Sequence, residues 1–322
     1  MGNWDWNLML FKSRGNNYPA PILVTGGHRT GTTWVGRMLT ASGEAAYISE
    51  PLNVLHRPGV MRAPVQRWYT YICPDNESGY LPALRQTLAC HYQLGAELVS
   101  LRSLRDVQRM GRDWATFLKG RIFRLRPLVK DPFALFSIPW FAERLGCQVV
   151  ITIRHPAAFA SSLMRLNWTF QLEDLLAQPL LMRDRLEPYR GEMEAMPTGD
   201  TIGRASLLWK MAYRTVHDLC LKHPEYQLVR HEDYSLDPVQ RFRQLYTALG
   251  LQFTEQAQMT VQASSSSENP KELPASAVHA FQLDSRANLD NWKRRLSAQE
   301  IQRVRQITGE VAACFYPDDT WD

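Results

Sequence analysis

Cysteine is scarce in this sequence, which has five cysteines in 322 residues, widely spaced and without a Cys-x-x-Cys pair. An odd and scattered set of cysteines indicates neither a disulfide framework nor a zinc site. Residues 1–11 carry Asp5 and several Asn and Trp where a secretory signal needs a basic start and an unbroken apolar run. We therefore expect a protein that works in a reducing, cytoplasmic compartment.

Long apolar runs are also missing. None approaches the roughly 20 residues that cross a bilayer, and the richest stretch, 133–142, is interrupted by Ser137 and Pro139. No Pro/Gly/Ser-rich linker divides the chain, and motifs that have to cooperate lie toward both of its ends. We therefore expect a single domain over residues 1–322 and no transmembrane segment.

Charge of one sign is only slightly in excess, with 37 Lys and Arg against 32 Asp and Glu and a formal net charge of +5. The basic residues are dispersed rather than gathered in a tail, which suits small anionic ligands. Nucleic acid is the other anion to consider, but the sequence has no zinc-finger, helix-turn-helix or RNP-like signature. We therefore expect no nucleic-acid partner.

Short apolar, β-branched runs alternate with stretches of helical periodicity, which is typical of a parallel sheet covered by helices. The alternation predicts an α/β protein of the P-loop type, with a central parallel β-sheet flanked by helices. Strands are expected at Ile22–Thr25, Ala46–Ile48, Leu128–Lys130, Val149–Ile153 and Gln227–Arg230. Helices are expected at Thr33–Thr40, Ala157–Leu166, Ala205–Lys222 and Pro238–Leu249, the last closed by Gly250 as a C-terminal cap. A loop is expected at Ser264–Ser267.

The strongest local signal is the glycine-rich turn between the first strand and the first helix, Gly26-Gly27-His28-Arg29-Thr30-Gly31-Thr32-Thr33. Glycines let the backbone curl with its N–H groups inward, and the helix N-terminus adds partial positive charge where an anion would sit. Thr32 and Thr33 add hydroxyl donors. The turn therefore predicts a phosphate site, although a glycine-rich turn alone also serves as a plain tight turn.

Two residues distinguish this turn from the loop of an ATPase or kinase. Thr32 follows the Gly-x-x-x-x-Gly spacing where a nucleoside triphosphate loop places Lys. The strand Val149–Ile153 ends in Arg154, where a magnesium-binding strand would end in an acidic residue. The cation of the turn is Arg29, inside the loop. We therefore expect phosphate binding without a metal.

Four segments together resemble the sulfotransferases that use 3'-phosphoadenosine-5'-phosphosulfate (PAPS), most closely the carbohydrate-type members. The stretch 28–34, HRTGTTW, resembles the family's 5'-phosphosulfate loop, written PKSGTTW in cytosolic members and RSGSSF in carbohydrate-modifying ones. Arg154-His155-Pro156 with Ser162 resembles the 3'-phosphate motif, in which a strand-end Arg and a helix Ser bind that phosphate. Residues 228–251 are similar to the family's strand, acidic turn and helix, and 285–300 to its closing motif, with Trp292 and Lys293 at the familiar dipeptide.

The resemblance implies PAPS as donor and PAP as product. It also implies a set of donor-binding residues: Gly27, His28, Arg29, Thr30, Gly31, Thr32, Thr33, Trp34, Arg154, Ser162 and, where a basic residue often helps to hold the 3'-phosphate, Arg286. Two departures weaken it, because Ala287 and Asp290 replace glycines of the closing motif. A third is Pro132, which stands where the catalytic His of cytosolic members follows Lys by two residues.

A general base is still needed, and the segment 47–53, YISEPLN, resembles the Glu-Pro-Leu segment of carbohydrate-type members. The resemblance implies Glu50 as the base; a plain turn residue before Pro51 is the alternative. Arg29 is expected to stabilise the departing phosphate. Lys130 is expected either to contact the sulfuryl group or orient the acceptor, or to form an ion pair with Asp131.

The remaining expectations concern the acceptor and the residues around the motifs. Segments 57–125 and 167–199 match no motif and are expected to form the acceptor side. The acceptor is a hydroxyl or amine of a small molecule, lipid or carbohydrate, and no oligomeric state is predicted. Glu232 and Asp233 are interpreted as structural residues on an extended segment, with Glu232 binding a loop amide, and His28 and His155 as loop residues.

Two other functions stay open at this point. A P-loop kinase of unusual type would bind magnesium-ATP. A non-catalytic protein would keep the PAP or PAPS pocket for sensing or interaction.

Overall fold

A five-stranded parallel sheet forms the centre of the molecule. The computed structural model describes residues 19–270, 282 and 284–321. The strand order across the sheet is β2-β3-β1-β4-β5, and every neighbouring pair is parallel. The strands are β1 (Ile22–Gly26), β2 (Ala45–Ser49), β3 (Arg126–Lys130), β4 (Gln148–Ile153) and β5 (Gln227–Arg230). The predicted fold class is confirmed.

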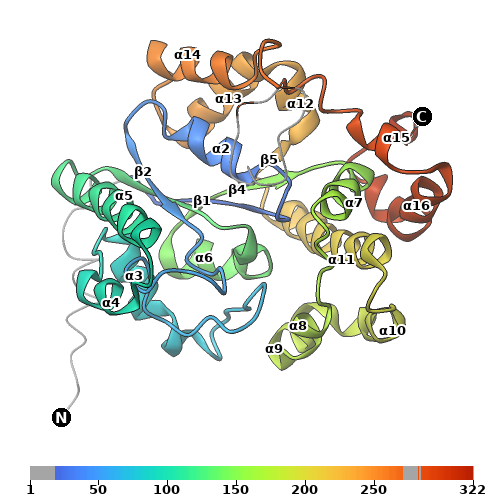
Figure 1. The fold of residues 1–322 in the computed structure, drawn as a ribbon, viewed down its shortest axis with the longest axis horizontal. Helices are drawn as coiled ribbons and strands as arrows, with labels where there is room; N and C mark the ends of the chain where they lie inside the picture. The colour runs from blue at the N-terminus through green and yellow to red at the C-terminus, as the bar shows by residue number, and fades with distance from the viewer. Residues whose placement is uncertain (1–18, 271–281, 283, 322) are drawn as a thin grey trace.

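Alternation along β1 divides the interior into two apolar layers. Leu23 packs in a large core with α7 (Pro156–Arg165), α11 (Thr201–Lys222) and α16 (Ala298–Ala312). Ile22 and Val24 pack in a second core with α2 (Thr32–Leu39), α13 (Pro238–Leu249) and α14 (Glu255–Ser264). In Figure 1 the helices α2, α13 and α14 lie on one side of the sheet and α6 (Ile138–Leu145) and α11 on the other. A strand buried on both faces needs apolar residues at every position, which is why β1 reads Ile-Leu-Val.

The other helices are short or lie at the periphery of the sheet. They are α3 (Leu81–Leu88), α4 (Leu94–Ser100), α5 (Leu104–Ile122), α8 (Glu173–Leu176), α9 (Pro179–Leu181), α10 (Arg190–Ala195), α12 (His231–Leu236) and α15 (Asn291–Arg295), with one π-helical turn at Met182–Leu186. Four 3-10 turns lie at Glu77–Gly79, Pro132–Ser137, Glu187–Tyr189 and Asp318–Trp321. None of the described helices is long and apolar enough to cross a membrane.

The strand register brings the sequence motifs to one edge. Gly26 of β1 lies beside Thr152 of β4, and Ser49 of β2 beside Lys130 of β3. The carboxyl ends of parallel strands meet at the same edge of a sheet, where α/β proteins bind ligands. The glycine-rich turn, Glu50, Lys130 and Arg154 therefore lie along one edge.

Two local expectations are wrong, and a third is off by one residue. Glu232 and Asp233 do not lie on an extended segment but in the first turn of α12, where acidic side chains favour the helix N-terminus. The loop expected at Ser264–Ser267 begins one residue later, at Ser265, because Ser264 is the last residue of α14 and its hydroxyl donates to the carbonyl of Val261. Helix α11 begins at Thr201 rather than Ala205, because Asp200 caps it by accepting from the amide of Gly203 at 2.9 Å. The predicted cap at Gly250 is confirmed, with φ of 68°.

Candidate active site

The glycine-rich turn is held by contacts to β4 and α11. The Thr30 hydroxyl donates to the carbonyl of Gly27 and lies 2.7 Å from the hydroxyl of Thr152. The Gly27 amide donates to the Tyr213 hydroxyl at 3.0 Å. Gly26 has φ of 146°, and a β-carbon there would lie 2.3 Å from the carbonyl oxygen of Thr152, so only glycine fits. Gly31, Thr32 and Thr33 form the N-terminal end of α2, where backbone N–H groups favour an anion.

Several residues of the predicted donor-binding set use polar groups within the protein. The His28 amide donates to the Tyr69 hydroxyl at 3.3 Å, as the Gly27 amide does to Tyr213. Trp34 is buried in the core, and its indole N–H donates to the Ser264 hydroxyl at 2.9 Å. Trp34 therefore positions α2 through packing.

Arg29 connects the turn to the predicted 3'-phosphate motif. Its backbone is left-handed, with φ of 69°, and its Nε donates to the Ser162 hydroxyl at 3.4 Å. Burial, followed by the nearby Arg154 and Arg165 guanidinium groups, lowers the pKa of Arg29 to about 10. Residues 133 positions apart in sequence thus meet at one place, and that place is crowded with positive charge.

Arg154 follows β4 and is fixed from several sides. Its carbonyl accepts from the Trp209 indole at 2.9 Å. Burial lowers the pKa of its guanidinium. The carboxylate of Glu232 acts against this shift, and the cations of Arg295 and Arg165 add to it. Glu232 accepts from the His155 amide at 2.8 Å, which is the loop-amide contact predicted for it. The site therefore places a strand-end guanidinium where Ser162, Arg29 and Arg165 also lie.

The closing motif contributes differently from what the sequence suggested. Arg286 is exposed and donates to the carbonyl of Leu236 at 2.6 Å. Arg295, two residues after Lys293, is the residue of this motif that influences Arg154 electrostatically. Arg165 was also missed, although it stands three residues after Ser162 in α7, and such residues share one face of a helix.

The second half of the site joins the ends of β2 and β3. The Glu50 amide donates to the carbonyl of Lys130 at 2.8 Å, and their side chains form an ion pair. Lys130 therefore pairs with Glu50 and not with Asp131 as one expectation had it. The Lys130 side chain is 1% exposed and the Glu50 side chain 17% exposed. The side-chain amide of Asn53 donates to the Glu50 carboxylate at 2.6 Å. Glu50 also has a left-handed backbone, with φ of 49°, a conformation that costs free energy in a residue with a side chain.

Asp131 holds the turn that carries Glu50. Its carboxylate accepts from the amide of Leu52 and, at 3.0 Å, from the amide of Phe133. Asp131 is fully buried, and burial raises its pKa to about 7. The sequence pointed to Asp131 only as an ion-pair partner, whereas it fixes the backbone around Glu50.

The His28 ring lies between the two halves. Its Nδ1 lies 2.8 Å from the Tyr69 hydroxyl, and its ring contacts Phe133, Phe159 and Phe170. Burial lowers its pKa to about 4, reinforced by Arg29 and opposed by Glu50. The influence of both Arg29 and Glu50 on one ring shows that the half containing the turn and the half containing Glu50 adjoin.

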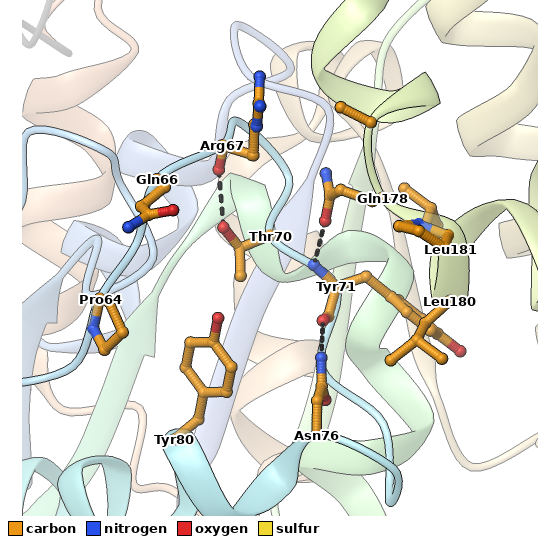
Figure 2. Close-up of a pocket in the computed structure, with 12 residues that line it drawn as sticks. Pro64, Gln66, Arg67, Thr70, Tyr71, Asn76, Tyr80, Gln178, Leu180 and Leu181 are labelled. Atoms are coloured by element: carbon orange, nitrogen blue, oxygen red, sulfur yellow. Dashed lines mark hydrogen bonds between the residues drawn. The ribbon is translucent and has the colours of Figure 1, made fainter.

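A pocket of about 280 Å³ lies between the two segments that match no motif. It is lined by Pro64, Gln66, Arg67, Thr70, Tyr71, Asn76, Tyr80, Ala177, Gln178, Pro179, Leu180 and Leu181. Figure 2 shows the Tyr80 hydroxyl directed toward Thr70, whose own hydroxyl donates to the carbonyl of Arg67. Tyr69, the residue before Thr70, reaches His28 with its hydroxyl. Thr70 lines the pocket and Tyr69, the residue before it, contacts the glycine-rich turn, so the pocket and the turn are linked by adjacent residues.

Metal ligation finds no support in the described part of the chain, which contains no group of three or more His, Cys, Asp or Glu residues placed to hold an ion. A parallel sheet with a glycine-rich turn and arginines at its carboxyl edge defines an α/β protein of the P-loop type.

Comparison with known proteins gives the family. The chain belongs to the sulfotransferase family, whose model matches residues 21–255. Carbohydrate sulfotransferase 3 of Mus musculus is 24% identical over 197 residues, which are 59% of this chain and 36% of that protein. The Homo sapiens protein of the same name is 23% identical over 197 residues, with 59% and 35% covered. The matched region thus spans about a third of these relatives.

Among solved structures, the sulfotransferase domain from the curacin biosynthetic pathway is similar, with a TM-score of 0.49 and 14% identity over 90% of this chain and 98% of that one. The family that the four motifs resemble is thereby confirmed by the family model and the curated relatives.

Proposed function

We propose that this chain transfers the sulfuryl group of PAPS to a hydroxyl or amine of its acceptor. One observation carries the proposal: the half-buried Arg29 contacts Ser162 of α7 and lies close enough to Arg154 and Arg165 for both cations to lower its pKa. Like charges in a poorly solvated place repel one another unless an anion lies among them. A nucleotide with phosphate groups at both its 5' and 3' positions supplies such an anion, and guanidinium groups match phosphate geometry.

The residues divide between two ends of the donor. PAPS supplies an activated bond between sulfur and a phosphate oxygen. In our proposal Arg29 and the N-terminal end of α2 bind the 5' end, and Arg29 stabilises the negative charge that collects there as that bond breaks. Arg154 and Ser162 bind the 3'-phosphate. The contact of Arg29 with Ser162 at 3.4 Å supports a single nucleotide that touches both groups.

Glu50 acts as the general base in this proposal. The acceptor hydroxyl loses its proton to the Glu50 carboxylate, its oxygen forms the new bond to sulfur, and the electron pair of the broken bond stays with the 5'-phosphate of PAP. The ammonium of Lys130 pairs with the Glu50 carboxylate before reaction, and in our proposal it also stabilises charge on the sulfuryl oxygens. Asp131 and Asn53 orient Glu50, one through the backbone of its turn and the other through its carboxylate.

Among small-molecule, lipid and carbohydrate acceptors, we propose a carbohydrate. The relatives are named carbohydrate sulfotransferase 3, and the pocket beside Tyr69 combines aromatic side chains of Tyr71 and Tyr80 with the polar groups of Gln66 and Asn76. Sugars bind in sites that offer apolar ring faces and a few convergent polar groups.

Thermal melting with three ligands tests the donor. A ligand that binds only the folded state raises the melting temperature, so PAP and PAPS are expected to stabilise the protein and magnesium-ATP is not. Stabilisation by magnesium-ATP that PAP does not displace would instead support a kinase-like enzyme. Incubation with ³⁵S-labelled PAPS and pools of glycans, lipids and small molecules then identifies the acceptor. PAP binding without label transfer to any pool would support a non-catalytic binding protein.

A further inference from the structure

Helix α5 is unusually exposed for its length. Of its 19 residues, Phe117 and Gly120 are the buried ones, whereas α11 buries most of its 22 residues. The helix runs beside the edge strand β2, at the end of the molecule opposite α15 and α16 (Figure 1). A helix that buries so little needs other contacts to fix it in place.

The inner side of α5 is nevertheless firmly attached. A β-carbon on Gly120 would lie 2.6 Å from the sulfur of Cys90 and 3.1 Å from the β-carbon of Ala46 in β2, so glycine allows the close approach. Phe117 packs edge-to-face against Tyr92, with ring centroids 5.3 Å apart. The helix is thus held on the domain with a fixed orientation, and its opposite side faces solvent.

Arg57 anchors the N-terminal end of α5 through two acidic residues. Arg57 forms an ion pair with the fully buried Glu97 of α4 and lies 3.8 Å from Asp106. Asp113 is also partly buried, and burial raises its pKa. Both acidic side chains of α5, those of Asp106 and Asp113, therefore lie toward the domain.

The solvent-facing side of α5 carries a row of large apolar residues. Their spacing of three, seven, four and four residues keeps them on one face of a helix. They are Leu104 (83% exposed), Val107 (44%), Trp114 (46%), Leu118 (39%) and Ile122 (62%). A row of this kind, unlike single exposed apolar residues, indicates an interaction surface.

A second row beside the first is basic. It consists of Arg105, Arg109, Arg112 and Lys119, all exposed. In the part of the chain that the structure describes, none of the four forms a salt bridge. The outer surface of α5 is therefore apolar along one strip and cationic along the next.

We infer that this face of α5 binds the surface of a lipid bilayer that contains anionic lipids, with the helix axis parallel to the membrane. An apolar strip flanked by Arg and Lys, with a Trp among the apolar residues, is the arrangement that places a helix at the boundary between headgroups and acyl chains. The basic row contacts lipid phosphates, and the apolar row enters the acyl region.

A second copy of the chain fits this face less well. A symmetric contact through the apolar row would bring two basic rows close to each other, and like charges across an interface oppose association. An anionic bilayer satisfies both rows at once. The inference does not depend on the proposed chemistry, and its test measures no sulfuryl transfer.

Vesicle sedimentation of the full chain tests the inference, with vesicles of phosphatidylcholine alone or with about 30% phosphatidylglycerol. The wild-type chain is expected to bind the anionic vesicles, to bind the zwitterionic ones at least about tenfold more weakly, and to be released by salt. Failure to bind anionic vesicles, or equal binding to both kinds, overturns the inference.

Two variants separate the two rows. Leu104→Gln combined with Ile122→Gln is expected to weaken binding about tenfold through lost apolar burial. Arg109→Glu combined with Arg112→Glu is expected to weaken it by more than tenfold and to reduce its salt dependence. All four residues are exposed, so unchanged melting temperatures are expected to show that both variants fold.

The matched controls lie on other faces of the molecule. Leu221→Gln combined with Met259→Gln changes residues that are 73% and 58% exposed, and Lys222→Glu combined with Arg241→Glu changes the charge equally. Both controls are expected to bind like the wild type. Equal losses in controls and α5 variants overturn the inference. So does a wild-type dimer that the Leu104 and Ile122 changes convert to a monomer, since a second copy then covers this face.

Discussion

The two halves of the site solve opposite electrostatic problems. Around Ser162, cations face cations, and the pKa of Arg29 is lowered to about 10. Around Glu50, the charge of a buried ammonium is matched by a carboxylate. The first half gathers positive charge, whereas the second pairs a buried cation with a carboxylate. The comparison suggests that donor binding and proton transfer respond to substitution in different ways.

The largest expected effect comes from Arg29→Met. We expect kcat/KM for PAPS to fall about 10³-fold, because the variant loses both a phosphate contact and the charge that stabilises the leaving group. In the absence of ligand the variant is expected to melt at a higher temperature, since repulsion from Arg154 and Arg165 is relieved. Activity assays and ligand-free melting measure the two effects.

The control for Arg29 is Arg144→Met, which removes an exposed guanidinium that pairs with Glu77. It is expected to leave PAPS kinetics unchanged. If Arg29→Met instead lowers the melting temperature and keeps its affinity for PAP, Arg29 is a structural part of the turn and the comparison fails.

Glu50→Gln is expected to separate the two halves. Turnover falls by about 10²-fold or more because the acceptor proton has no base, whereas PAP affinity stays nearly intact because the donor half is unchanged. Single-turnover rates and PAP titration measure the two quantities. Glu143→Gln, at an exposed position in α6, serves as the control. Unchanged turnover in Glu50→Gln removes this residue from the mechanism.

Asp131→Asn tests the positioning role of the second half. We expect kcat to fall about tenfold with an unchanged KM for PAPS, because the turn around Glu50 loses one of its fixed acceptors. The pKa of Asp131, about 7 in the folded protein, lies above its ordinary value of 3.8. Its contribution to stability is therefore fully present below pH 4 and lost as the pH rises through 7.

The difference in melting temperature between Asp131→Asn and the wild type, measured from pH 4 to pH 7, is expected to shift in favour of the variant as the pH rises. A pH-independent difference would mean that Asp131 is ionised throughout this range. A fall in kcat accompanied by an equal rise in KM would mean that the substitution disturbs the donor half as well.

The smallest effect is expected from His155→Phe, in the donor half. The His155 ring stacks on Trp292 at 5.0 Å, and neither ring nitrogen has a hydrogen-bond partner among the described residues. Burial, reinforced by the cations of Lys293 and Arg154, lowers its pKa from 6.5 to about 3. Its contribution to stability is therefore present above pH 6.5 and lost as the pH falls toward 3, the reverse of Asp131.

The Phe variant lacks this titration, so it is expected to retain more stability than the wild type at pH 4 to 5 and to differ little at pH 8. Melting curves across this range measure the difference. An equal loss of stability on acidification in both proteins would show that His155 is already protonated when folded.

The sequence predicted what depends on short stretches of chain. The apolar β1, the glycine turn and the C-terminal cap at Gly250 follow from local patterns, and the structure contains all three. The pairing of Lys130 with Glu50 was not predicted. Glu50 is 80 residues away from Lys130 in sequence, whereas Asp131 is the next residue and was the obvious local partner. Tyr69 and Tyr213 were missed for the same reason, since they reach the turn from 41 and 186 residues away.

The Tyr213 hydroxyl joins the two places that the donor touches in our proposal. It accepts from the Gly27 amide at 3.0 Å and donates to the carbonyl of Thr152 at 2.9 Å, two residues before Arg154. The turn and the strand tip are thus linked through one side chain of α11. In our proposal, this link helps to set the separation between the cations before any ligand arrives. We therefore expect a nucleotide with a phosphate at only one end to bind more weakly than PAP.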